Sequence, residues 1–287
     1  MTDAFLATVA LVIGACVGSF LNVCIARWPA EQSVVSPRSR CPGCGSAIAW
    51  YDNVPVASWL VLRGRCRTCS VPISMQYPAV EIVVALGWLA AALAYGPTFT
   101  ALRVAVFGTV MFGIALTDLK HYLIPDGFTV FAFIFVLATS IVAFVLSDVS
   151  PFAGPWDALI GACTGAGAIA IVGWLGEAML KREAMGFGDV TLMAVVGAAV
   201  GPTRALLVIF VGAALGALTF LLFVLPVMRW RRRAVVAEVP ESEGGGSDGS
   251  NMPNVPFGVF LAPAAVLMLV AGDRLLAWYL ARAGATP

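Results

Sequence analysis

Long apolar stretches recur along almost the whole chain, and most of them have the length needed to cross a lipid bilayer. A helix of about 20 apolar residues spans the hydrocarbon layer. By this measure we expect about eight spans, near residues 4–26, 78–96, 99–118, 126–147, 154–178, 188–201, 203–227 and 256–281. The sixth stretch is short and contains glycine. The pattern predicts an all-α polytopic membrane protein.

The composition supports a membrane protein over a soluble one. The chain is 60% hydrophobic and 11% charged, whereas a soluble protein carries about 25% charged residues. A formal net charge of +1 indicates no particular partner besides the lipid bilayer, and we expect no nucleic acid. The N-terminal stretch lacks a basic start and is longer than the apolar region of a signal peptide, so we expect a first transmembrane helix, not a cleaved leader.

The basic residues predict the orientation in the membrane. With eight spans, residues 27–77, 119–125, 179–187 and 228–255 lie on one side, and these segments hold 13 of the 17 Lys and Arg residues. Lys and Arg gather on the cytoplasmic side of membrane proteins. We therefore expect the insert 27–77 in the cytoplasm and both termini outside it. An odd number of spans would remove this asymmetry.

Four of the seven cysteines form a pattern. Cys41 and Cys44 lie in CPGC, and Cys66 and Cys69 lie in CRTC. Two such pairs at this separation are typical of a zinc ribbon, and four thiolates would complete a closed tetrahedral shell. Disulfides are disfavoured in the cytoplasm. We predict a structural zinc ion that supplies folding energy to a polar, Pro-rich insert; redox-active or incidental cysteines are the alternative.

Two aspartates are predicted at the same membrane face. Asp118 comes at the end of the third span, and Asp189 follows GFG at the start of the sixth. Two close carboxylates cannot both ionise cheaply, so one keeps a proton. The ionised one can activate water, and the protonated one can polarise a peptide carbonyl and protonate the leaving amine. Gly186 and Gly188 would let the backbone bend and a substrate strand approach.

The residues alone leave other roles open for these acids. An acid at a membrane edge can cap a helix, pair with a basic side chain such as Lys120 or Arg182, or line an ion path. Glu81 and Glu177 are expected to form structural pairs or to assist at most. An ion-coupled transporter and a membrane-anchored zinc-ribbon binding protein are the alternative functions. No internal repeat supports the first, and the second leaves GFGD without a role.

The motif GxGD alone would be a weak signal, but it is one of seven segments that occur in a characteristic order. These segments are GSFLNVCIARWP (18–29), SPRSRCPGC (36–44), WYDNVPVASWLVLRGRCRTC (50–69), YPAVE (77–81), TDLKHYLIPD (117–126), GFGDV (186–190) and PFGVFLAP (256–263). The ordered set resembles the bacterial type IV prepilin peptidases, membrane aspartic proteases of the GxGD type. The resemblance implies an endopeptidase of the bacterial inner membrane that cleaves basic leader peptides from type IV prepilins and type II secretion pseudopilins. Asp118 and Asp189 match the two aspartates of the family.

The resemblance also implies methyl transfer. Longer members of the family carry the four-cysteine domain and methylate the new N-terminal amine, with S-adenosyl-L-methionine as the methyl donor. The chain has no Rossmann-type glycine-rich signature, so the donor pocket is expected around residues 18–81. Asn22, Arg27, Tyr77 and Glu81 lie in matching segments and are the candidates for that pocket.

The resulting division of the chain has five parts. We expect a first transmembrane helix (1–26), a cytoplasmic zinc-binding domain (27–77), transmembrane helices two to seven with the aspartic protease site (78–227), a flexible cytoplasmic loop (228–255), and the last transmembrane helix with the C-terminus (256–287).

Overall fold

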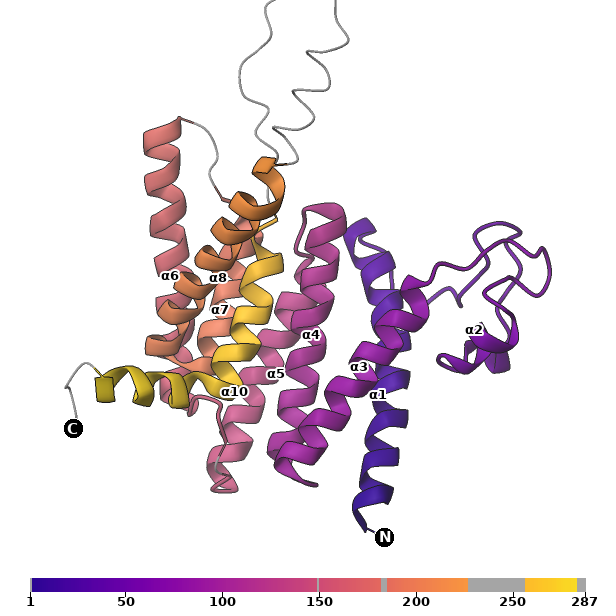
Figure 1. The fold of residues 1–287 in the computed structure, drawn as a ribbon, viewed down its shortest axis with the longest axis horizontal. Coiled ribbons are helices and arrows are strands. Elements are labelled where there is room, and N and C mark those ends of the chain that lie inside the picture. Colours follow the sequence, from indigo (N-terminus) through magenta and orange to yellow (C-terminus); the bar gives the residue numbers. More distant parts are fainter. Residues whose placement is uncertain (1, 149, 182–184, 227–255, 283–287) are drawn as a thin grey trace, which may run out of the picture.

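The computed structural model describes residues 2–148, 150–181, 185–226 and 256–282, which fold almost entirely into α-helices. The apolar helices are α1 (Thr2–Arg27), α3 (Gln76–Tyr95), α4 (Phe99–His121), α5 (Asp126–Val145), α6 (Pro155–Leu180), α7 (Phe187–Val200), α8 (Pro202–Thr219) and α10 (Gly258–Arg282). Figure 1 shows them side by side in one bundle, with the short helix α2 (Ala57–Val61) outside it.

Within the described ranges, seven helices are long and apolar enough to cross a membrane. The exception among the apolar helices is α7, which has 14 residues. At 1.5 Å per residue such a helix covers about 21 Å, less than the roughly 30 Å of the hydrocarbon layer. The predicted fold class, an all-α polytopic membrane protein with a short sixth segment, is confirmed.

Helix α7 is buried because α6 packs directly against its backbone. A Cβ added at Gly161 would lie 2.1 Å from the carbonyl oxygen of Gly197, and one at Gly165 would lie 2.3 Å from that of Met193. Glycine permits this approach, as small residues commonly do between membrane helices. Met193 and Val196 have no exposed surface. The position of α7 is therefore set by its neighbours.

Successive helices alternate in direction, so their connections lie at two ends of the bundle. Figure 1 shows the ends of α1 and α4 and the starts of α3, α5, α7 and α10 in the upper part of the drawing, which we call the upper face. The start of α1 and the end of α10 lie at the opposite face. The described parts of the segments 27–77, 119–125 and 179–187, which are predicted to be cytoplasmic, thus share one face, while the orientation of that face in a membrane stays a prediction.

The insert between α1 and α3 contains two matching knuckles. In the first, the N–H of Cys41 donates to the carbonyl of Ser46, and in the second, the N–H of Cys66 donates to the carbonyl of Val71, both at 2.9 Å. An isolated antiparallel bridge closes each knuckle. The two C-x2-C pairs therefore adopt the same local fold.

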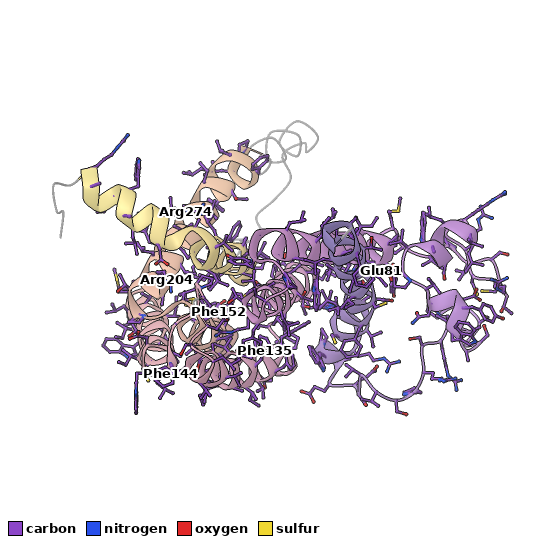
Figure 2. The ribbon with its side chains drawn as sticks, turned by 90° about the horizontal axis from the view of Figure 1, so that it is seen from below. Glu81, Phe135, Phe144, Phe152, Arg204 and Arg274 are labelled. Atoms are coloured by element: carbon purple, nitrogen blue, oxygen red, sulfur yellow. The ribbon has the colours of Figure 1, made fainter. Side chains whose placement is uncertain are left out.

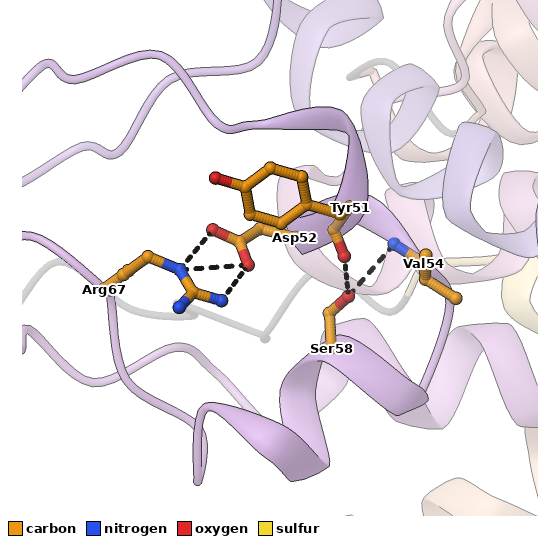
Figure 3. Close-up of polar contacts among 5 residues, drawn as sticks. All are labelled: Tyr51, Asp52, Val54, Ser58 and Arg67. Carbon is orange, nitrogen blue, oxygen red and sulfur yellow. Dashed lines mark hydrogen bonds and ion pairs between the residues drawn. The ribbon is translucent and has the colours of Figure 1, made fainter.

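Polar contacts order the chain between the knuckles (Figure 3). Arg67 pairs with Asp52, with Nη2 2.5 Å from Oδ1 and Nε 2.8 Å from Oδ2, and its guanidinium lies 5.6 Å from the centre of the Tyr51 ring. The Arg67 guanidinium holds the pKa of the Asp52 carboxyl below its usual value. The Ser58 hydroxyl accepts from the N–H of Val54 and donates to the carbonyl of Tyr51.

Replacing Gly165 by alanine should separate α6 from α7, whereas the same change at Gly167 should not. A Cβ at Gly165 would collide with a backbone oxygen, and one at Gly167 would meet no atom within 4 Å. We expect Gly165→Ala to lower the free energy of unfolding by about 1–3 kcal/mol. Thermal unfolding of both purified variants in one detergent measures the difference, and equal stabilities would contradict the packing described.

Candidate functional site

The two predicted aspartates lie on different helices, each at the end of its helix that reaches the upper face. Asp118 is in the last part of α4 and only 5% exposed. Asp189 is in the first turn of α7 and partly buried. Gly188, next to Asp189, and Gly258, which touches the Asp118 carboxylate, both pack against Ile124. The structure brings together the two acids that the sequence placed at one face.

The start of α10 closes over Asp118. Its Oδ2 accepts a hydrogen bond of 3.2 Å from the backbone N–H of Val259. A Cβ added at Gly258 would lie 2.8 Å from the same oxygen. The N-terminus of a helix carries a partial positive charge and favours a nearby carboxylate. The segment PFGVFLAP therefore contributes in two ways: the N–H of Val259 donates to Asp118, and Gly258 leaves room for the Asp118 carboxylate.

Ile124 joins the three helices around the aspartates. A Cβ added at Gly188 would lie 3.0 Å from the Cβ of Ile124, and one at Gly258 would lie 3.0 Å from its Cδ1. Ile124 itself is buried. Glycine on α7 and on α10 therefore lets both helices approach the chain that follows Asp118. Sequence reasoning gave no role to Ile124 or Gly258, although a glycine at the start of an apolar segment is the available signal.

Gly186 and Gly188 differ in what they contribute. Gly186 has φ −76° and ψ 150°, values open to any residue, so the bend before Asp189 does not depend on glycine there. A Cβ at Gly186 would meet no atom within 4 Å. Gly188 instead serves the tight contact with Ile124. The open space beside Gly186 would allow the backbone of a substrate peptide to lie close to this segment.

The structure does not pair either aspartate with a basic side chain. Among the described residues, neither Asp118 nor Asp189 forms a salt bridge. Lys120 instead donates a hydrogen bond to the side chain of Gln76 on α3. Lys181, another basic partner considered, is exposed and forms no ion pair among the described residues, and Arg182, the third, lies outside them. Asp118 instead accepts its hydrogen bond from the backbone at the start of α10.

The four patterned cysteines converge in the insert. The sulfur atoms of Cys41, Cys44, Cys66 and Cys69 all lie within 4.8 Å of one another, and those of Cys41 and Cys69 are 3.7 Å apart. The cluster can hold a metal ion. Backbone N–H groups of Cys69 and Thr68 lower the pKa of the Cys66 thiol to about 6, which favours the thiolate that metal binding requires.

A cavity of about 530 Å³ lies between this cluster and the ends of α1 and α3. All four pocket candidates, Asn22, Arg27, Tyr77 and Glu81, line it, together with two cysteines of the cluster. This volume is within the range of about 300–1,000 Å³ for small-molecule sites. The structure thus gathers residues from both membrane helices and from the insert around one space.

Two of the candidates make contacts that fix the insert or the helices. Both terminal nitrogens of Arg27 donate to backbone carbonyls of the insert, those of Ser33 at 2.8 Å and Pro37 at 2.7 Å. Asn22 is 4% exposed, and its Nδ2 donates to the carbonyl of Tyr77 at 3.1 Å. The Oδ1 of Asn22 is enclosed and has no hydrogen-bond partner.

Glu81 connects the bundle to the insert. Figure 2 shows it on the side of the bundle that borders the insert, across the view from Arg204 and Arg274. Its side chain is 8% exposed, and its Oε2 accepts a hydrogen bond of 2.7 Å from the N–H of Val56. Sequence reasoning missed this contact, because no periodicity relates positions 56 and 81.

Comparison with known proteins identifies the same two regions. The profile described as "Bacterial Peptidase A24 N-terminal domain" matches residues 12–95, which include the cavity and the cysteine cluster. The profile described as "Type IV leader peptidase family" matches residues 105–221, which include both aspartates. No solved structure matches the chain significantly.

Curated relatives carry related names. A "Prepilin leader peptidase/N-methyltransferase" of Myxococcus xanthus is 44% identical over 65% of this chain and 54% of that protein. A "Type 4 prepilin-like proteins leader peptide-processing enzyme" of Escherichia coli is 38% identical over 67% of this chain and 76% of that protein. A "Prepilin leader peptidase/N-methyltransferase" of Stutzerimonas stutzeri is 32% identical over 94% and 92%.

Proposed function

The chain belongs to the type IV leader peptidase family, and we propose on that basis that it cleaves the leader from prepilins and N-methylates the new N-terminus. The single observation that carries the peptidase assignment is that the end of α4, with Asp118, and the start of α7, with Asp189, lie at one face of the bundle. Type IV prepilins and type II secretion pseudopilins, which carry basic leaders, are the proposed substrates. Neither an ion-coupled transporter nor a zinc-ribbon anchor accounts for the family match.

Cleavage needs one ionised and one protonated aspartate. The ionised carboxylate takes a proton from a water molecule, whose oxygen attacks the carbonyl carbon of the scissile peptide bond. The protonated partner polarises the carbonyl oxygen, and a proton passes to the amine as the C–N bond breaks. No covalent intermediate with the enzyme forms. The hydrogen bond from Val259 holds Asp118 in place for this step.

The upper face suits a substrate that lies partly in the membrane. We assign this face to the cytoplasmic side of the bacterial inner membrane, so that both ends of the described chain lie on the other side. A prepilin then presents its basic leader in the cytoplasm and its apolar helix in the lipid, with the scissile bond at the boundary. The predicted loop 228–255 lies outside the described residues.

We assign methyl transfer to the cavity at the insert. S-adenosyl-L-methionine, bound there, would supply the methyl group. The fit is supported by the size of the cavity. Tyr77 and Trp59 also line the cavity and offer aromatic surface. Arg27 holds the insert backbone at one wall of the cavity through its bonds to Ser33 and Pro37.

We assign a structural zinc ion to the four cysteines. Sulfurs placed tetrahedrally at about 2.3 Å from zinc lie about 3.8 Å apart, which agrees with the 3.7 Å between Cys41 and Cys69. Four thiolates close the shell and leave no position for a substrate. Because Cys41 and Cys66 line the cavity, the metal would fix one of its walls.

Substituting either aspartate should abolish cleavage. Asp118→Asn and Asp189→Asn each remove a carboxyl that the proton transfers require, so we expect cleavage to fall by about 10³-fold or more. The assay incubates each purified variant with a prepilin and follows leader loss by mass spectrometry. Asp126→Asn is the matched control, because Asp126 is an exposed acid at the same face. Full cleavage by either test variant would remove that residue from the mechanism.

Adding one methyl group at Gly258 should displace Asp118. The new Cβ would lie 2.8 Å from the Asp118 Oδ2, so the carboxylate must move. We expect Gly258→Ala to lower the cleavage rate about tenfold or more, since small displacements of a catalytic group are costly. Gly216→Ala is the control, because its Cβ would make an ordinary contact of 3.4 Å with Phe260. Equal rates for the two variants would show that α10 does not set the position of Asp118.

Metal analysis tests the zinc assignment. Purified protein should contain about one zinc ion per chain. Cys66→Ser should lower the zinc content and reduce methyl transfer more than cleavage, because the cluster borders the cavity and not the aspartates. Cys163→Ser, at an exposed position on α6, should change neither. A metal-free preparation with four free thiols that still methylates would refute the assignment.

A further inference from the structure

Two acceptors without donors lie at the cavity between α1, α3 and the insert. Glu81 uses Oε2 to hold the N–H of Val56, and its Oε1 has no hydrogen bond among the described residues. The Oδ1 of Asn22 is enclosed and lacks a partner in the same part of the chain. Both residues line the cavity. A group that fits here must bring hydrogen-bond donors.

Among the described residues, Glu81 also forms no ion pair. The ion pairs of the described residues are Arg67 with Asp52 and Arg204 with Asp273. Arg27 and Arg40 line the cavity as well, but neither forms an ion pair with Glu81, and both terminal nitrogens of Arg27 donate to backbone carbonyls of the insert. Burying a carboxylate without an ion-pair partner costs free energy. A cationic group that also donates hydrogen bonds would therefore be the most favourable ligand at this position.

An unusual turn fixes the Glu81 carboxylate. Val56 has φ 59° and ψ −51°, a conformation that β-branched residues rarely adopt. The N–H of Ala57 donates to the carbonyl of Pro55 at 2.5 Å, which closes a one-residue turn around Val56. Glu81 receives the N–H that this turn presents. Backbone strain of this kind persists where surrounding contacts enforce it, and it clusters at functional sites.

We propose that Glu81 and Asn22 form the subsite that binds the α-ammonium group of the newly cleaved pilin, the acceptor of the methyl group. The proposal rests on the methyl-transfer function proposed above. Both residues belong to membrane helices: Asn22 lies five residues before the end of α1, and Glu81 five residues after the start of α3. A mature pilin keeps its apolar segment in the lipid, so its N-terminus reaches the cavity from this side, while the methyl donor enters from the aqueous insert.

The carboxylate has a chemical role besides binding. An ammonium nitrogen has no lone pair, so one proton must leave before it can accept a methyl group. That proton passes from the ammonium to the Glu81 carboxylate. The freed lone pair then forms the new N–C bond while the bond from that carbon to sulfur breaks, with its electron pair remaining on sulfur. Glu81 releases the proton to water afterwards.

The test compares two peptides on each enzyme variant. The full-length protein, with zinc and in lipid nanodiscs, is titrated with a peptide that matches the mature N-terminus of a prepilin, and with the same peptide acetylated at that N-terminus. Hydrogen bonds to charged groups indicate that the wild type binds the free amine about 10- to 100-fold more tightly. Glu81→Gln should bind both peptides equally. The glutamine Oε can still accept from Val56, so the turn is kept.

Glu31→Gln is the matched control, because it removes an exposed carboxylate outside the cavity lining and should keep the wild-type ratio. The ratio compares two ligands on one protein, so a loss of folded protein does not change it. A wild-type ratio in Glu81→Gln would refute the subsite. Weaker binding of S-adenosylhomocysteine by Glu81→Gln, with the peptide ratio unchanged, would assign the ammonium to the methyl donor and likewise refute the proposal.

Failure of the underlying function is separable from failure of the subsite. Mass spectrometry of a prepilin co-expressed with the wild-type enzyme shows whether a methyl-sized gain follows leader loss. No gain would refute the methyl-transfer function itself. A gain, together with an unchanged peptide ratio in Glu81→Gln, would refute only the role of Glu81.

Discussion

The direct backbone contact between α6 and α7 determines where Asp189 can lie. Helix α7 is too short to reach both faces of a membrane, so its depth is not set by its own length. Gly161 and Gly197 allow the two backbones to touch, which fixes α7 along the longer helix α6. Helices α5, α8 and α10 enclose its other sides. As a result the start of α7 reaches the upper face, the face at which α4 ends and Asp118 is found.

The aspartates and the insert cavity are linked by contacts that cross the upper face. The Trp28 ring, just after α1, packs edge to face on Phe128 at 4.4 Å. A Cβ at Gly127 would lie 2.6 Å from that ring, so glycine is needed for the contact. Lys120 of α4 bonds to Gln76, the residue before Tyr77 of the cavity. These contacts hold the two proposed reaction sites in a fixed relation, as successive steps on one membrane-held substrate require.

Features that depend on local pattern could be predicted from the sequence, and long-range contacts could not. Segment length gave the helices, cysteine spacing gave the cluster, and counting spans placed Asp118 and Asp189 at one face. The contact between Glu81 and Val56 has no such signature, because it joins a helix to an irregular loop. The bend before Asp189 does not depend on Gly186, because the backbone there is extended in a way that any residue can adopt. Glycine permits a left-handed backbone, but the residue type alone does not say whether the chain adopts it.

The shape and the position of the insert depend on two different sets of contacts, one within the insert and one between the insert and the membrane helices. Of residues 28–75, only Cys41 and Gly64 are buried, so the insert has almost no hydrophobic core. A metal ion bound to the four cysteines would fix its internal shape, but a closed thiolate shell has no contact with the bundle. Arg27 and Glu81 supply that contact by holding backbone groups of the insert. The cavity exists between these attachments, so its shape depends on the metal and its position depends on the membrane helices.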